Sequence, residues 1–137
     1  DKFSYAILEA ILRTYLTPTK IQDENLSLTL FNRSREDLIN IANKLVKKLP
    51  DNLVKQYNIE VKQTEVEAGS GSLPLEKLKS AALQFNGKVK SSELSRKFRM
   101  AENPVLGYIT SNKFYIDLKA IPPSQETQLL TTLSIIL

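Results

Sequence analysis

The spacing of hydrophobic residues predicts helices at both ends of the chain. Over residues 1–16, apolar side chains recur about every 3.6 positions, which is the period of an amphipathic helix. A second helix is predicted after Ser34, because Ser34-Arg35-Glu36-Asp37 has the form of a capping box and Pro50 marks its end. A terminal helix is predicted from Ser124 onward, after two prolines break the chain.

Between these helices, the apolar period changes to two and predicts strands. The predicted strands are residues 57–66, 80–85, 105–109 and 114–118. A short helix that carries Leu94 and Phe98 lies between the second and third strands, and a Ser111-Asn112 turn makes the last two a hairpin. Leu26, Leu28 and Leu30 also alternate with polar residues, so we expect a short extended segment there.

The predicted order is helix, helix, strand, strand, helix, strand, strand, helix. Helices packed on one side of a small, mainly antiparallel sheet would bury the apolar surfaces of both. We therefore expect one α+β domain over residues 1–137. Within it, 1–16 is a helix, 17–33 a connection, and 34–137 an α-β-β-α-β-β-α body.

Composition removes several kinds of chemistry. The 137 residues include no cysteine and no histidine, which excludes disulfides, thiolate nucleophiles, imidazole bases and the usual zinc sites. No apolar run approaches the length of a membrane span, and no secretory signal is present, so we expect a cytoplasmic protein without a membrane partner. The formal net charge of +4 is only mildly favourable for binding nucleic acid or phosphorylated ligands.

Two segments are candidates for binding. The loop containing Ser70, Gly71 and Ser72 is typical either of a site that lines a polar ligand or of a plain strand connection. Arg96 and Arg99 lie three apart on the predicted short helix, which favours either an anion site or a solvated helix face. Asp117, on a predicted strand, is expected to point toward solvent or a structural arginine.

Several motifs, in order, resemble the bacterial selenocysteine synthases. The stretch 68–74 is similar to that family's Gly-Gly-Gly-Ser-Leu-Pro, 103–109 to its Pro-Pro-Val-Ile-Gly-Arg-Ile, and 114–119 to its Leu-x-Leu-Asp-Leu-Arg. The similarity begins at Asp1 and runs to about residue 123. Tyr108 stands where the family has an arginine, and Ser70 where it has a glycine.

The resemblance implies the small C-terminal domain of an aspartate-aminotransferase-type (fold type I) enzyme that uses pyridoxal 5′-phosphate. Such an enzyme converts seryl-tRNA(Sec) to selenocysteinyl-tRNA(Sec) with selenophosphate as donor. The imine-forming lysine and the cofactor would belong to a large domain preceding Asp1, and the helix over residues 1–16 would lead in from that domain. This chain alone would therefore be inactive.

By the same resemblance, Ser70, Gly71 and Ser72 would contact the substrate. Arg96 and Arg99 would bind an anion. The whole protein would be a homo-oligomer. Two alternatives remain open: a non-catalytic module for tRNA binding or oligomerisation, and the small domain of another lyase or transferase that uses pyridoxal phosphate.

Overall fold

The computed structural model describes residues 1–17, 21, 25–67 and 77–137. The chain divides into two compact units, Asp1–Arg33 and Ser34–Leu137. In the part of the first unit that the structure describes, the elements are α1 (Lys2–Thr14) and α3 (Leu26–Asn32). Those of the second unit are α4 (Arg35–Lys48), α5 (Asp51–Tyr57), β1 (Ile59–Glu67), β2 (Lys77–Phe85), α6 (Ser91–Arg99), β3 (Tyr108–Thr110), β4 (Lys113–Asp117), a 3-10 helix (Pro123–Gln125) and α7 (Glu126–Ile136).

Helices α1 and α3 are both capped by side chains. Asp1 accepts from the Phe3 amide at 3.0 Å, and Asn25 accepts from the Leu28 amide at 3.2 Å. The second cap explains why the extended segment expected around Leu26 is wrong. Asn25 accepts a hydrogen bond from an N–H group of the first helical turn that has no partner within the helix. This hydrogen bond favours a helix, although the alternating leucines are also compatible with a strand.

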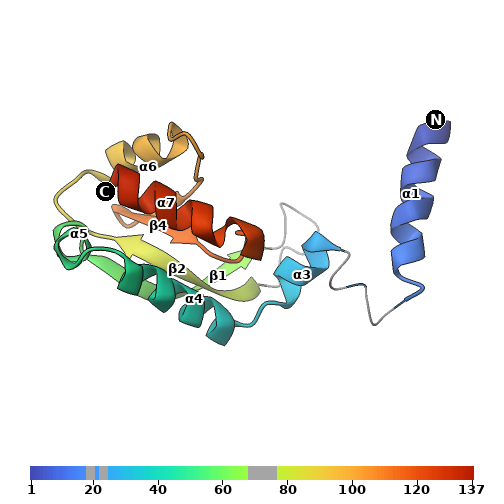
Figure 1. The fold of residues 1–137 in the computed structure, drawn as a ribbon, viewed down its shortest axis with the longest axis horizontal. Helices are drawn as coiled ribbons and strands as arrows, with labels where there is room; N and C mark the ends of the chain where they lie inside the picture. Colours follow the sequence, from blue (N-terminus) through green and yellow to red (C-terminus); the bar gives the residue numbers. More distant parts are fainter. Residues whose placement is uncertain (18–20, 22–24, 68–76) are drawn as a thin grey trace. The chain divides into compact units, whose positions relative to one another are not determined.

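The second unit is a two-layer α+β structure. Its four strands form one antiparallel sheet in the order β1-β2-β4-β3, which confirms the predicted sheet. Figure 1 shows α4 and α7 lying along the sheet, with β2 visible between them. The predicted order of elements lacked α5, which follows Pro50 and ends at Asn58 in a left-handed conformation.

The strand register separates an apolar face of the sheet from a polar one. Leu83 in β2 is paired with Val61 of β1 and Ile116 of β4. The next residue, Gln84, is paired with Glu60 and Tyr115, because successive side chains point to opposite faces.

All three longer helices of the second unit pack on the apolar face. One core cluster joins buried residues of α4, α6 and α7 to the apolar face: Leu38, Ala42, Leu45, Leu94, Phe98, Leu129, Leu133, Ala81, Leu83, Phe85, Phe114 and Ile116. Phe85, Phe98 and Phe114 lie at its centre, with ring centroids 5.5–5.8 Å apart. The helices therefore lie on one side, as expected, and the polar side chains of the sheet share the other.

Candidate polar face and adjoining cavity

The polar face of the sheet is organised around Asp117, at the end of β4. Its Oδ2 accepts a hydrogen bond from Thr64 Oγ1, and its Oδ1 accepts one from Ser80 Oγ, both at 2.6 Å. Its Oδ1 also accepts from the Lys119 amide at 3.0 Å. Because Thr64 lies on β1 and Ser80 on β2, one carboxylate connects three strands. The expectation that Asp117 points to solvent or an arginine is wrong, since two hydroxyls satisfy its oxygens.

Two tyrosines lie next to this carboxylate. Tyr108 of β3 and Tyr115 of β4 are cross-strand neighbours, and their rings stack with centroids 5.2 Å apart and planes 4° apart. Tyr115 donates its hydroxyl to Gln84 Oε1 at 2.8 Å. Burial, followed by the negative charge of Asp117, raises the pKa of Tyr108 above its usual 10.0, so its hydroxyl is protonated at neutral pH.

An ion pair completes the described polar face. Lys62 Nζ lies 2.5 Å from Glu60 Oε2 on the same strand. The hydrogen bond and the charge of Lys62 lower the pKa of Glu60 below 4.5, and the same contact with Glu60 raises the pKa of Lys62 above 10.5. The positive charge of Lys62 is therefore paired with the negative charge of Glu60.

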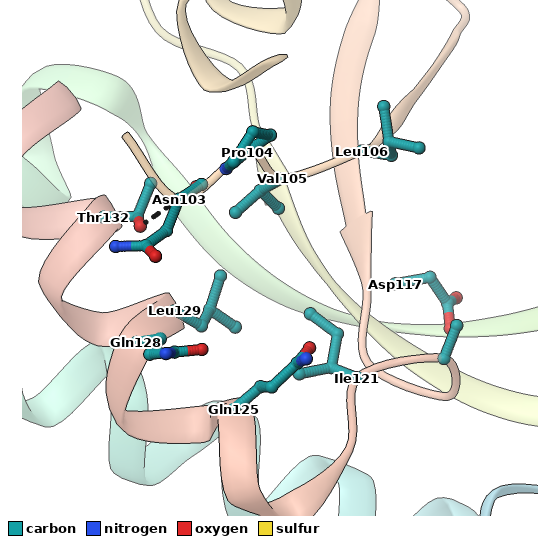
Figure 2. Close-up of a pocket in the computed structure, with 11 residues that line it drawn as sticks. Asn103, Pro104, Val105, Leu106, Asp117, Ile121, Gln125, Gln128, Leu129 and Thr132 are labelled. Atoms are coloured by element: carbon teal, nitrogen blue, oxygen red, sulfur yellow. Dashed lines mark hydrogen bonds between the residues drawn. The ribbon is translucent and has the colours of Figure 1, made fainter. Parts of the chain in front are cut away.

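Asp117 also borders a cavity of about 320 Å³ on the second unit. Its walls are formed by the segment 103–106, by the turn that follows β4, and by α7. Figure 2 shows Gln125 and Gln128 beside Leu129 and Ile121, with the hydrogen bond from Thr132 Oγ1 to the Asn103 carbonyl at 3.4 Å marked. The lining is aliphatic and amide in character, and Asp117 is its one ionisable residue among those described.

This chemistry suits binding better than catalysis. The cavity offers no paired carboxylates, no lysine and no arginine among the described residues. In the same part of the chain, no group of three acidic, histidine or cysteine side chains is placed to hold a metal ion. Nor does any described helix have the length and apolar character needed to cross a membrane.

The two predicted arginines lie together at the end of α6. Arg96 and Arg99 are exposed in its last turn, where positive charge also interacts favourably with the helix dipole. Lys97, between them, pairs with Glu93 at 3.6 Å. Neither guanidinium group has a hydrogen bond or ion pair with another described residue. The prediction that they bind an anion therefore remains a prediction.

The other predicted site, Ser70, Gly71 and Ser72, lies outside the described residues. Sequence reasoning missed Thr64 and Ser80 as partners of Asp117. The strand alternation places all three on one face, but no local motif identifies which hydroxyls reach the carboxylate.

Comparisons with known proteins identify similar sequences. The family model described as L-seryl-tRNA selenium transferase matches residues 1–122. An L-seryl-tRNA(Sec) selenium transferase of Actinobacillus pleuropneumoniae (serotype 5b) is 36% identical over 135 residues, which are 97% of this chain and 29% of that protein. Those of Haemophilus influenzae (strain PittEE) and Proteus mirabilis are each 33% identical, over 88% and 98% of this chain and 27% and 30% of their own lengths. The chain thus spans less than a third of these relatives.

Proposed function

The chain belongs to the L-seryl-tRNA selenium transferase family, and we propose that it is the C-terminal domain of an enzyme that converts seryl-tRNA(Sec) to selenocysteinyl-tRNA(Sec). The family match over residues 1–122 carries the proposal. It agrees with the resemblance found in the sequence. The selenium donor would be selenophosphate. The seryl hydroxyl would leave as water, selenium would bond to the side-chain carbon in its place, and the phosphoryl group of the donor would be released as phosphate.

The positions of the family motifs support a structural role for this chain. Gly107 and Asp117, which belong to two of those motifs, are used for packing and for connecting strands. An α+β unit with helices on one face of an antiparallel sheet is compatible with the small domain of an aspartate-aminotransferase-type enzyme.

The cavity beside Asp117 and the polar face do not fit pyridoxal 5′-phosphate, the cofactor implied by the resemblance. This cofactor needs a lysine amine for its aldehyde and hydrogen-bond donors for its phosphate. No lysine lines the cavity beside Asp117. Lys62 on the polar face is paired with Glu60, and the buried Lys119 is not free. We propose that residues outside this chain hold the cofactor, and that this chain supplies no reactive lysine.

The proposed contributions of this chain are therefore binding and positioning. Arg96 and Arg99 carry exposed guanidinium groups suited to phosphate or carboxylate, and both the tRNA backbone and selenophosphate supply such oxygens. Ser70, Gly71 and Ser72 remain proposed substrate contacts. We also propose that the whole enzyme is a homo-oligomer and is located in the cytoplasm.

A chimaeric enzyme tests the proposed function. In the Actinobacillus pleuropneumoniae relative, the 135 aligned residues would be replaced by this chain. With seryl-tRNA(Sec), selenophosphate and pyridoxal phosphate, we expect the chimaera to form selenocysteinyl-tRNA(Sec), while the 137-residue chain alone forms none. A folded chimaera without activity, or turnover by the chain alone, would contradict the proposal.

The same chimaera tests the anion site. Arg99→Ala is expected to raise the KM for tRNA or for selenophosphate by about tenfold, because one charge-assisted contact contributes roughly 1–2 kcal/mol. Lys47→Ala is the matched control, since Lys47 is also an exposed cation in the last turn of a helix. Equal kinetics for the two variants would remove Arg99 from the site.

A further inference from the structure

Helix α1 presents apolar side chains that no described residue of its own unit covers. None of its thirteen residues is buried. The exposed apolar side chains, including those of the turn that follows the helix, are Phe3, Tyr5, Ile7, Leu8, Ile11, Leu12, Tyr15 and Leu16. Leucines 8, 12 and 16 border a shallow hollow, which has Glu9 and Arg13 among its other lining residues.

The polar side of α1 is narrow. Lys2, Glu9 and Arg13 share one face, because they are separated by seven and four positions. Glu9 and Arg13 form an ion pair at 2.7 Å along it. Apolar residues occupy most of the remaining circumference. A helix that is apolar on more than half of its surface is normally buried by its surroundings.

Length leads to the same conclusion. Isolated helices shorter than about 12–15 residues are marginal in water, so α1 needs tertiary contacts to be stably formed. An Asp1 cap and one exposed ion pair contribute little by comparison. The missing stabilisation has to come from an apolar surface that covers the helix.

We infer that the apolar side of α1 is a docking surface for the part of a selenium transferase polypeptide that lies outside this chain; this inference rests on the proposed function. The family match includes α1, so the helix belongs to the sequence shared by the family. About 70% of each relative has no counterpart here. That part is large enough to supply a groove with two apolar walls.

A second copy of this chain fits the helix less well. Pairing two α1 helices would bury one stripe on each, as in a coiled coil, and would leave the rest of the broad apolar surface in water. A groove encloses more of the circumference, and the strip of Lys2, Glu9 and Arg13 remains as the solvent-facing edge.

Amide hydrogen exchange tests this inference on three proteins: the 137-residue chain, the chimaera described above, and the unmodified Actinobacillus pleuropneumoniae relative. We expect the α1 amides to exchange rapidly in the chain alone. In the chimaera, and in the aligned helix of the relative, they should exchange at least about a hundredfold more slowly. In the chimaera, Ile11→Asp should remove that protection, while Lys2→Asp, the same new residue on the polar strip, should leave it.

The amides of β2 and β4 report whether each protein is folded. If they are protected while the α1 amides are not, in the chimaera or in the relative, the inference is overturned. It is also overturned if the α1 amides are protected in the isolated chain. This holds whether that chain is a monomer or forms a dimer, which a concentration-dependent mass would show. Selenium transfer is assayed separately, so an inactive chimaera with a protected α1 would contradict the proposed function and leave the docking surface in place.

Discussion

Asp117 accepts a hydrogen bond from Ser80 at 2.6 Å, and the Ser80 side chain is fully buried on the neighbouring strand. The second carboxylate oxygen accepts from Thr64, one strand further. A buried hydroxyl loses its hydrogen bonds to water on folding, so it needs a protein partner. Asp117 supplies that partner, which explains an acidic side chain at the end of β4.

Replacing Asp117 by alanine should destabilise the second unit. The Ser80 hydroxyl would be left buried without a partner, and the connection to Thr64 would be lost. We expect the free energy of unfolding to fall by about 2–3 kcal/mol. Urea unfolding followed by circular dichroism measures this. Glu93→Ala, at an exposed carboxylate paired with Lys97, should change it by less than about 0.5 kcal/mol. Equal stabilities of the two variants would contradict the role given to Asp117.

Asp117 should also control the ionisation of Tyr108. Burial and the nearby negative charge both disfavour the phenolate, and so raise its pKa above 10.0. Asp117→Asn removes the charge but not the burial, so the pKa of Tyr108 should fall while remaining above 10.0. Titration of the ring resonances by NMR measures the change. Glu36→Gln removes a carboxylate that does not act on Tyr108 and should leave the pKa unchanged; a fall of the same size in both variants would contradict the assignment.

The Glu60–Lys62 pair predicts a second titration. Lys62 lowers the pKa of Glu60 below 4.5, so this pair stabilises the fold above that pH, and its contribution is lost as the pH falls through the lowered value. Lys62→Gln should therefore raise the pKa of Glu60 toward 4.5, as measured by carboxyl NMR titration. Lys113 also lowers this pKa, but its effect ranks below that of Lys62, so Lys113→Gln should raise it less. The reverse order would show that the pair is not formed.

Elements with an unambiguous period and end signals were predictable from the sequence. The helix after Ser34 begins with the hydrogen bond from the Asp37 amide to Ser34 Oγ at 3.0 Å that the capping box implies. The antiparallel sheet and the side on which the helices pack followed from strands of period two. In both cases, short-range patterning and burial favour the same structure.

Short elements were harder to predict, because few residues define a period. The alternation of Leu26, Leu28 and Leu30 is compatible with a strand and also with a helix of one or two turns. The Asn25 cap favours the helix. Helix α5 has seven residues and no side-chain cap, so Pro50 is the one sequence signal at its start. The partners of Asp117 were unpredictable for a different reason: Thr64 and Ser80 are 53 and 37 positions away, and only the strand register brings them together.

Gly107 is predicted to tolerate no side chain. A Cβ there would clash with the Tyr115 carbonyl oxygen and with the ring of Phe114, which is fully buried at the centre of the core. A main-chain atom of the sheet and a packed aromatic ring cannot both move aside without disturbing β4. Gly107→Ala should therefore lower the free energy of unfolding by about 2–3 kcal/mol, at the upper end of the usual cost of overpacking. Leu106→Ala is the adjacent control: its side chain is 78% exposed, so the change should stay within about 0.5 kcal/mol. Urea unfolding of both variants gives the comparison, and a Gly107→Ala protein as stable as the unsubstituted chain would show that the segment before β3 does not pack against β4 as described.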